Sequence, residues 1–355
     1  MPRKAYLALA VAACMLGGCN RPNANVKYRI AVIPKGLTHE FWQSIHRGAE
    51  RAAADLSAEG VATAIDWDGP QKESEGREQI NLVNLKVGTG IQGLVLAPQD
   101  SKRMFDCVVE VVDKGIPVVI IDSGLDPERL KQRPNLIVKY IATNNYNGGR
   151  LAAQRLLEVL AKDGKVDPRL VLLRYAVGSE STEQREQGFL DYIEEQKKAG
   201  KSIALLSTDQ YAGATTNEAE KNVGPLLVRY KDKMDGLFAV NESSSVGTLN
   251  ALRSQGLNGK VRFVAFDASE PILQAIREGD IHGTVVQDPY RMGYLGVWAL
   301  VKHLEGYDVR AGGPNLGTGE YVVTRENLDA EATRQLFDPA EQGKRTIEKP
   351  EFKKK

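Results

Sequence analysis

The chain has 355 residues, enough for about two domains, and carries 47 Lys and Arg against 46 Asp and Glu. This balance gives no basic field over the whole molecule of the kind that attracts nucleic acid. No apolar run after residue 28 reaches the length that crosses a membrane, which excludes a membrane-spanning helix there.

The N-terminus has the pattern of a secretory signal. Two basic residues precede a short apolar run over residues 5–16, which is too short to span a membrane comfortably. The run leads into LGGC, which resembles the lipobox of bacterial lipoproteins, where the Cys becomes the lipidated first residue. We expect a lipoprotein signal peptide at 1–18, followed by lipidated Cys19 and a linker within 19–27. An ordinary cleaved signal with an incidental cysteine is the alternative.

The cysteines predict no internal disulfide. Cys14 leaves with the signal and Cys19 becomes lipidated, so that Cys107 has no partner even in an oxidising compartment. Cys107 lies in MFDCVVEVVDKG, which has a helical pattern, and we expect it to be a buried apolar filler.

The first strand and helix place two aromatic residues side by side. YRIAVIP (28–34) predicts a buried strand, and Thr38 is placed to cap the helix that follows. Phe41 and Trp42 begin that helix beyond the carboxyl end of the strand, where open α/β sheets bind ligands. Core packing is the alternative, because Trp42 belongs to an apolar stripe of the helix. The stripe comprises Trp42, Ile45, Ala49, Ala52 and Leu56.

Apolar β-rich runs then alternate with amphipathic helices of roughly 12 to 20 residues. Such strands, separated by helices, indicate parallel sheets covered on both faces. A break after KYIATNNYNGG (139–149) favours two sheets, because the rhythm restarts there with a helix over 148–161. We therefore predict two similar α/β lobes in succession, with late segments crossing back between them. The runs are YRIAVIP (28–34), ATAIDWDG (62–69), GLVLAP (93–98), PVVIID (117–122), RLVLLRY (169–175), SIALLSTD (202–209), DGLFAVN (235–241), VRFVAFD (261–267) and GTVVQ (283–287).

Cofactor and metal motifs are weak. GTGIQG (88–93) satisfies G-x-G-x-x-G, but it follows a helix predicted over 74–87 and leads into a strand, the reverse of a dinucleotide site. Its glycines are better explained as a helix stop and a loop. His39 and His46 share a helix without another evident ligand, so we expect no metal and no cofactor.

Polar residues end several of the apolar strands. Such groups emerge from one edge of each sheet, and together with the aromatic pair they suit a sugar. Carboxylates and amides pair with ring hydroxyls, an arginine supplies a charge-assisted fork, and aromatic faces pack on C–H surfaces. The strand-end residues are Asp122, Asn241, Asp267 and Gln287, and Arg185 begins a helix after RLVLLRY.

In its motifs the chain resembles the periplasmic sugar-binding proteins of the ribose-binding type, which serve ABC transporters. The resemblance covers nearly all of residues 28–330. It rests on KYRIAVIPKGLTHEFWQSIHRGAE, GLVLAPQDS, GIPVVIIDSG, YIATNNYNGGRLAA, EQREQGF, GLFAVNESSSVG, VRFVAFDAS, GTVVQDPYRMGYLG and VVTRENLD, in this order. The family fold is a type I periplasmic binding protein, with two Rossmann-like lobes of parallel sheets that are joined by three crossovers and close on ligand by a hinge.

The resemblance implies a set of ligand residues. Phe41 and Trp42 would be stacking walls, and Tyr211 in DQYAG would be a further aromatic from the second lobe. The crossovers would fall near 143–144, 287–288 and 317–320. The hydroxyl-binding residues would be Asp122, Arg185, Asn241, Asp267 and Gln287.

Two departures from the ribose-binding pattern argue against ribose as the ligand. His39 and Glu40 replace Asn-Pro before the aromatic pair, and Ser123 replaces the Arg after Asp122, which removes a fork of donors. His39 is either a replacement donor or a surface residue at the helix start. Asp122 and Asp267 have an alternative role as helix N-caps or loop anchors.

The implied function is a lipid-anchored substrate-binding protein of an ABC sugar importer, not an enzyme. It would be periplasmic or extracytoplasmic, a monomer, and a partner of a permease. The expected division is an N-terminal lobe at 28–143 plus 288–317, a C-terminal lobe at 144–287 plus 318–330, and a tail at 331–355. We expect the basic EKPEFKKK in this tail to be solvated.

Four alternatives remain. The same closed form could dock on a histidine kinase or chemoreceptor as a sensor, or bind another small polar ligand such as a cyclitol or nucleoside. Lactose-repressor-type regulators share the two-lobed core, but the short stretch 20–27 leaves no room for a DNA-binding domain. Acidic cleft residues could in principle cleave a glycoside, although no nucleophile-elbow pattern is present.

Overall fold

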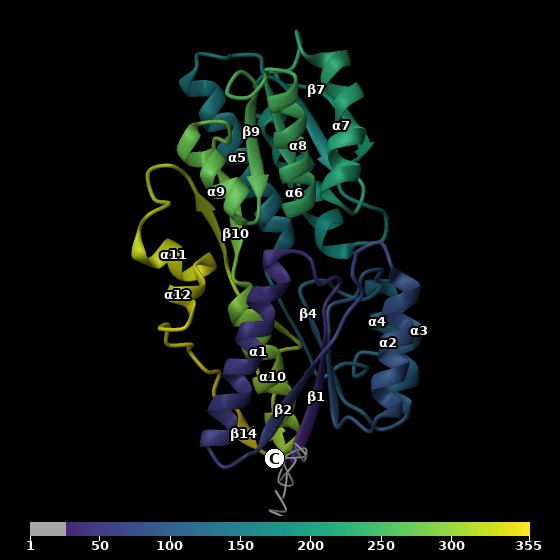
Figure 1. The fold of residues 1–355 in the computed structure, drawn as a ribbon. Helices are drawn as coiled ribbons and strands as arrows, with labels where there is room; N and C mark the ends of the chain where they lie inside the picture. The colour runs from purple at the N-terminus through teal and green to yellow at the C-terminus, as the bar shows by residue number, and fades with distance from the viewer. Residues whose placement is uncertain (1–25) are drawn as a thin grey trace, which may run out of the picture.

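The computed structural model describes residues 26–355 (Figure 1). The predicted signal peptide and Cys19 lie outside these residues. Within 26–355, none of the helices combines the length and apolar character that a membrane span requires.

The first lobe is built on a sheet of six parallel strands in the order β12-β5-β4-β3-β1-β2. Two apolar clusters cover its faces: one involves helices α1 and α10, and the other involves α2 and α3. The strands are β1 (Tyr28–Ile33), β2 (Thr63–Trp67), β3 (Gly93–Leu96), β4 (Val118–Ile121), β5 (Lys139–Ala142) and β12 (Asn315–Gly317). The helices are α1 (Glu40–Ala58), α2 (Gly76–Gly88), α3 (Arg103–Asp113), α4 (Pro127–Gln132) and α10 (Pro289–Leu304).

The second lobe repeats this plan with a sheet in the order β13-β10-β9-β8-β6-β7. Its clusters lie under α5 and α6 on one face and under α7, α8 and α9 on the other. The strands are β6 (Arg169–Arg174), β7 (Ala204–Tyr211), β8 (Gly236–Ala239), β9 (Arg262–Phe266), β10 (Thr284–Gln287) and β13 (Glu320–Val323). The helices are α5 (Asn145–Lys162), α6 (Glu180–Lys198), α7 (Thr216–Tyr230), α8 (Glu242–Ser254) and α9 (Glu270–Glu278).

Two α/β lobes are therefore confirmed, and all nine predicted strands are present. The sheets are parallel as predicted, except at one edge of the second sheet, where β13 runs antiparallel to β10. The segment before the predicted break contains a strand that was not predicted, β5, which leads into α5. The chain passes between the two sheets after β5, after β10 and after β12.

Helices α1 and α10 touch backbone to backbone. A Cβ on Gly48 would lie 2.0 Å from the carbonyl oxygen of Tyr290, and one on Gly293 would lie 2.0 Å from that of Ile45. Glycine is required at both positions because no side chain fits. The predicted apolar stripe of α1 faces this contact, and all five of its members are buried.

The predicted Thr38 cap is wrong. Helix α1 begins at Glu40, its N-cap residue is His39, and no side chain caps it. The imidazole of His39 turns instead to the carboxylate of Glu73, 2.7 Å away. The start of α1 is thus fixed by an ion pair rather than by a hydroxyl cap.

Cys107 is buried on α3, as predicted. Burial raises the pKa of its thiol to about 11. The GTGIQG segment joins the end of α2 to β3, with Gly90 at a φ of 79°. It is a helix stop and a loop, as its order in the sequence indicates.

Most residues of the C-terminal EKPEFKKK are exposed to solvent, as predicted, but the stretch is ordered against the first lobe. Helices α11 (Glu331–Phe337) and α12 (Pro339–Gln342) lie beside the region where the lobes meet (Figure 1, yellow). Strand β14 (Lys353–Lys354) then pairs with β11 (Tyr307–Asp308) of the first lobe. Phe352 packs against the apolar cluster of that lobe, which holds the basic residues in place.

Candidate functional site between the lobes

The carboxyl ends of strands from both sheets converge on a small cavity of about 30 Å³. This is where open α/β sheets bind ligands, and here two such edges face each other. The lining residues are Lys35, His39, Phe41, Trp42, Glu73, Asp122, Tyr175, Ser179, Ser181, Thr182, Arg185, Asn241, Glu242, Asp267 and Gln287.

The structure brings eight of the nine predicted ligand residues to this central cavity: His39, Phe41, Trp42, Asp122, Arg185, Asn241, Asp267 and Gln287. Tyr211 is not among its lining residues. It ends β7, the edge strand of its sheet, and is 40% exposed. Its hydroxyl accepts a 3.2 Å hydrogen bond from Arg174, whose guanidinium lies 5.7 Å from the ring centroid. These contacts hold the ring on the edge of the second lobe.

Four charged or phenolic residues of the cavity are absent from the sequence prediction. Lys35 and Tyr175 come just after β1 and at the end of RLVLLRY, so the strand-end rule used for the other polar residues could have found them. Glu242 directly follows Asn241. Glu73 lies in the loop between β2 and α2, where no local pattern marks it.

Lys35 connects the lobes. Its ammonium lies 3.0 Å from the carboxylate of Asp122 at the end of β4, and both side chains are almost fully buried. The ammonium also donates to the hydroxyls of Ser181 at 3.1 Å and Ser179 at 3.3 Å, at the start of α6. A buried charge of this kind is tolerated because its donors are paired.

Glu73 gathers three donors from both lobes. It pairs with the imidazole of His39 at 2.7 Å, and it accepts hydrogen bonds from the indole of Trp42 at 2.7 Å and the hydroxyl of Tyr175 at 2.5 Å. Burial lowers the pKa of His39, but the nearby carboxylate outweighs it and raises that pKa to about 9. Burial raises the pKa of Glu73, yet its partners bring it down to about 2. At neutral pH the pair is an imidazolium and a carboxylate. His39 is thus a cavity residue rather than a surface one.

The aromatic pair divides its roles. Trp42 is 2% exposed and belongs to the core of the first lobe, although one edge of it reaches the cavity. Phe41 is half-buried and meets Trp42 edge to face, with ring centroids 4.8 Å apart. Both the core and the site interpretations therefore apply to Trp42.

Arg185 is held in place by contacts within the protein. Its Nε donates to the side-chain oxygen of Asn145 and its Nη1 donates to the carbonyl of Val240, both at 2.9 Å. The guanidinium lies 3.8 Å from the ring centroid of Phe266. Burial lowers its pKa, while nearby carboxylates including Asp267 favour the charged form. These contacts preorganise a cationic fork at the cavity.

Asp122 and Asp267 are the non-glycine residues of 26–355 with positive φ, at 61° and 72°. Such backbone costs energy and concentrates at functional sites. Asp267 accepts hydrogen bonds from the backbone of Glu242 at 2.9 Å and the amide of Gln287 at 2.7 Å. Asp267 therefore anchors the loops around it and also lines the cavity. Asn241 similarly caps α8 by accepting from the backbone N–H of Ser244.

Glu242 is the cavity carboxylate with few partners. The backbone N–H of Phe41 donates to it at 3.5 Å, and burial raises its pKa to about 7. Within residues 26–355 no group of three or more His, Cys, Asp or Glu could hold a metal ion.

Comparison with known proteins gives consistent matches over most of the chain. A model of the periplasmic binding protein domain matches residues 30–308. The D-ribose/D-allose-binding protein of Pseudomonas aeruginosa is 28% identical over 282 residues, covering 79% of this chain and 83% of that protein. The ribose import binding protein of Haemophilus influenzae is 26% identical over 305 residues, covering 86% of this chain and 95% of that protein.

Solved structures agree with this likeness. A carbohydrate transporter solute-binding protein from Agrobacterium radiobacter, in complex with D-arabinose, has a TM-score of 0.77 at 28% identity, covering 88% of this chain and 99% of that one. An ABC transporter solute-binding protein from Agrobacterium vitis, with bound D-fucose, has a TM-score of 0.76 at 28% identity, covering 87% and 99%.

Proposed function

The chain belongs to the periplasmic binding protein family, and from that premise we propose that it is the sugar-binding protein of an ABC importer. It binds a monosaccharide or a related polyol between its lobes, closes on it and delivers it to a permease. The relatives with sugars in their names or in their crystals support this assignment.

The observation that carries the proposal is the convergence of fixed polar groups from both lobes beside an aromatic pair. Asp122, Asp267 and Gln287 supply acceptors and donors at strand ends, and Arg185 supplies a cationic fork. Ring hydroxyls both donate and accept, so they match such a mixed set. Phe41 offers an apolar face to the C–H groups of a sugar.

Closure follows from contacts that exist only when the lobes meet. In the closed form, Lys35 reaches Ser179 and Ser181, and Glu73 reaches Tyr175. A sugar ring needs more room than 30 Å³, so the lobes separate to admit it, and its hydroxyls then take over part of these contacts. Ligand shifts the population towards a closed form because it touches both lobes.

We further propose how the chain divides into lobes and how the protein is held at the membrane. The lobes are 28–143 plus 288–317 and 144–287 plus 318–330. The mature chain is held at the membrane through lipidated Cys19 and acts as a monomer in the periplasm or an equivalent extracytoplasmic space. Two or more acyl chains hold a protein durably where one does not. A Cys19→Ser variant should lose metabolic labelling with palmitate, and retained labelling would contradict the anchor.

Isothermal titration of the wild-type protein with a panel of carbohydrates tests the function. The panel contains pentoses, hexoses, deoxysugars, cyclitols and nucleosides. We expect at least one sugar or polyol to bind with about micromolar affinity, which corresponds to about 8 kcal/mol. Failure of the entire panel to bind would overturn the assignment.

A further inference from the structure

Residues 329–347, which we call the C-terminal segment, cross from the second lobe back to the first. They follow β13, the last strand of the second sheet in chain order, and contain α11 and α12. In Figure 1 both helices lie in the yellow stretch beside the region where the lobes meet. The segment lies beyond residues 30–308, which the family model matches.

One end of the C-terminal segment is attached to the second lobe. Leu336 is 6% exposed and belongs to an apolar cluster of that lobe, and Phe337 packs against the same cluster. At the start of the segment, Asp329 lies 3.5 Å from the guanidinium of Arg277 on α9. An exposed ion pair of this kind contributes little, so apolar burial is the main attachment at this end.

The other end is attached to the first lobe through α1. The side chain of Gln342 is fully buried, and its nitrogen donates to the hydroxyl of Ser44 at 2.8 Å. Its oxygen accepts from the guanidinium of Arg47 at 2.9 Å. A few residues later, Ile347 is buried in the apolar cluster of the first lobe that involves α1 and α10.

Arg345 attaches the segment to one of the crossovers between the lobes. Its guanidinium pairs with the carboxylate of Asp288, which is fully buried, directly follows β10 and caps α10. A buried charge that loses its partner is strongly unfavourable. This pair therefore fixes the first-lobe end of the segment beside the hinge.

The stretch between the two attachments is short and stiff. Asp338 accepts a hydrogen bond from the backbone N–H of Ala340 at 2.9 Å, and Pro339 begins α12 with a fixed φ. The side-chain nitrogen of Gln342 also donates to the carbonyl of Leu336 at 2.8 Å. The two attachments are thus joined through one side chain, which leaves little slack between them.

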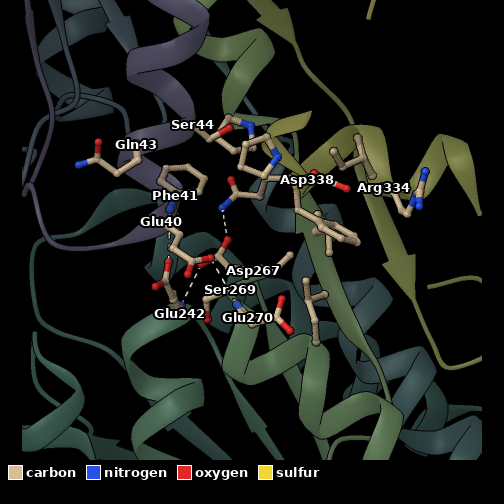
Figure 2. Close-up of a pocket in the computed structure, with 18 of the residues that line it drawn as sticks. Glu40, Phe41, Gln43, Ser44, Glu242, Asp267, Ser269, Glu270, Arg334 and Asp338 are labelled. Carbon is tan, nitrogen blue, oxygen red and sulfur yellow. Dashed lines mark hydrogen bonds between the residues drawn. The ribbon is translucent and has the colours of Figure 1, made fainter. Parts of the chain in front are cut away.

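A groove of about 680 Å³ lies between this segment and the contact of the two lobes. Figure 2 shows Glu40 and Phe41 of the first lobe, Ser269 and Glu270 of the second lobe and Arg334 of the C-terminal segment around this space. The carboxylate of Glu40 accepts from the backbone N–H of Glu270 at 3.3 Å, so the lobes touch here. When these residues separate, the two ends of the segment are drawn apart, because each end is fixed to one lobe.

We propose that the C-terminal segment is a fourth connection between the lobes and restrains their opening. Opening requires that the hydrogen bonds of Gln342 to α1 break or that α11 leave the second lobe. Each such hydrogen bond shifts an equilibrium by about two- to tenfold, so the segment shifts the ligand-free protein towards the closed form. This restraint goes beyond the sugar-binding function and does not depend on the identity of the ligand.

An insertion that lengthens the segment tests the proposal. Gly-Gly-Ser-Gly-Gly-Ser between Phe337 and Asp338 adds slack and keeps the residues of both attachments. The control is the same insert between Val166 and Asp167, in the exposed loop that joins α5 to β6 within the second lobe. Small-angle scattering without sugar should show a two- to tenfold higher ratio of open to closed protein for the first insertion, roughly, and the wild-type ratio for the control.

Leu336→Ala and Leu226→Ala form a second, matched pair. Both leucines are 6% exposed and belong to the same apolar cluster, but Leu226 lies on α7. Both substitutions remove similar packing and should lower the free energy of unfolding by similar amounts. Only Leu336→Ala loosens the C-terminal segment, so only this variant should increase the radius of gyration of the ligand-free protein.

The outcomes decide between restraint and simple packing. A lengthened segment in a protein as compact as the wild type would overturn the proposal. If that insertion prevents folding, wild-type compactness of Leu336→Ala would overturn it equally. Opening of Leu226→Ala to the same extent as Leu336→Ala would mean that lost core packing controls the hinge, and the proposal would fall. Scattering is measured without sugar, so none of these results depends on the titration that tests sugar binding.

Discussion

The hydroxyl of Tyr175, on the second lobe, donates a 2.5 Å hydrogen bond to the carboxylate of Glu73, on the first lobe. The side chain of Glu73 is only 7% exposed and also contacts His39 and Trp42. The bond from Tyr175 therefore ties the second lobe to this charged network of the first lobe. A hydrogen bond to a charged group contributes about 1.5–3 kcal/mol. Closure of the ligand-free protein should therefore depend on it.

Tyr175→Phe should raise the ratio of open to closed protein, without sugar, by about tenfold or more. The substitution removes the hydrogen bond to Glu73 and leaves its carboxylate with one donor fewer. Small-angle scattering without sugar should give a larger radius of gyration than for the wild type. Tyr192→Phe, on α6 of the same lobe and away from the cavity lining, is the control and should leave the radius unchanged. A Tyr175→Phe protein as compact as the wild type would contradict this role.

The backbone at Asp267 predicts an unusual order of variants. With φ at 72°, alanine is strained there by about 1–2 kcal/mol and glycine is not. Asp267→Gly should thus be more stable than Asp267→Ala by roughly 0.5–1 kcal/mol, after allowance for the greater freedom of glycine in the unfolded chain. Urea denaturation measures this difference.

The helical position Gln274 supplies the comparison. There the order of stability should reverse. The free energy of unfolding of Gln274→Ala should exceed that of Gln274→Gly by about 1 kcal/mol. Equal stability of the two Asp267 variants would show that the backbone carries no strain.

Stability should fall as pH rises from 6.5 through 9. The pKa of His39 is raised from 6.5 to about 9 in the folded protein, so the folded state binds its proton more tightly than the unfolded state does. The resulting stabilisation is complete below pH 6.5 and is lost as pH rises through 9. Free energies of unfolding from urea titrations across this range measure the slope.

His39→Gln should flatten that slope, because glutamine does not titrate. His303→Gln on α10, where burial lowers the pKa of the imidazole, should retain the decline. A wild-type slope in the His39→Gln protein would mean that other groups cause it.

The C-terminal segment should stabilise the folded protein through Gln342. This side chain is fully buried and links Arg47, Ser44 and the carbonyl of Leu336. Gln342→Ala should lower the free energy of unfolding by about 1–3 kcal/mol, because it leaves buried partners unsatisfied. Exposed Glu348→Ala, a few residues later, should change it by less than about 0.5 kcal/mol. Equal stability of both variants would mean that the segment is only loosely attached.

The fold was largely predictable because apolar runs and helical stripes are local signals. All nine predicted strands are present, and so is the buried face of α1. The elements missed are those that depend on distant partners. Strand β5 is short and flanked by turn-forming residues, β12 to β14 find their partners only in the folded lobes, and the basic C-terminus is ordered by a two-residue strand and one phenylalanine.

The site residues that directly follow apolar strands were predictable from the sequence. Asn241, Asp267 and Gln287 lie together because neighbouring parallel strands of the second sheet end at the same edge. Asp122 joins them from the facing edge of the first sheet. Glu73 could not be found this way, because a loop carboxylate gives no pattern. The Thr38 cap was predicted wrongly because the start of α1 is fixed by the ion pair of His39 with Glu73. This is a tertiary contact, which the local sequence does not indicate.

We propose that the polar groups at the strand ends hold a sugar between the lobes. The measurement that tests it most directly is isothermal titration of Asp267→Asn with the best-binding sugar of the panel, beside the wild type and exposed Asp232→Asn. Loss of the buried carboxylate should weaken binding about 10- to 100-fold, while Asp232→Asn should bind as the wild type does. Wild-type affinity in a folded Asp267→Asn protein would contradict the account.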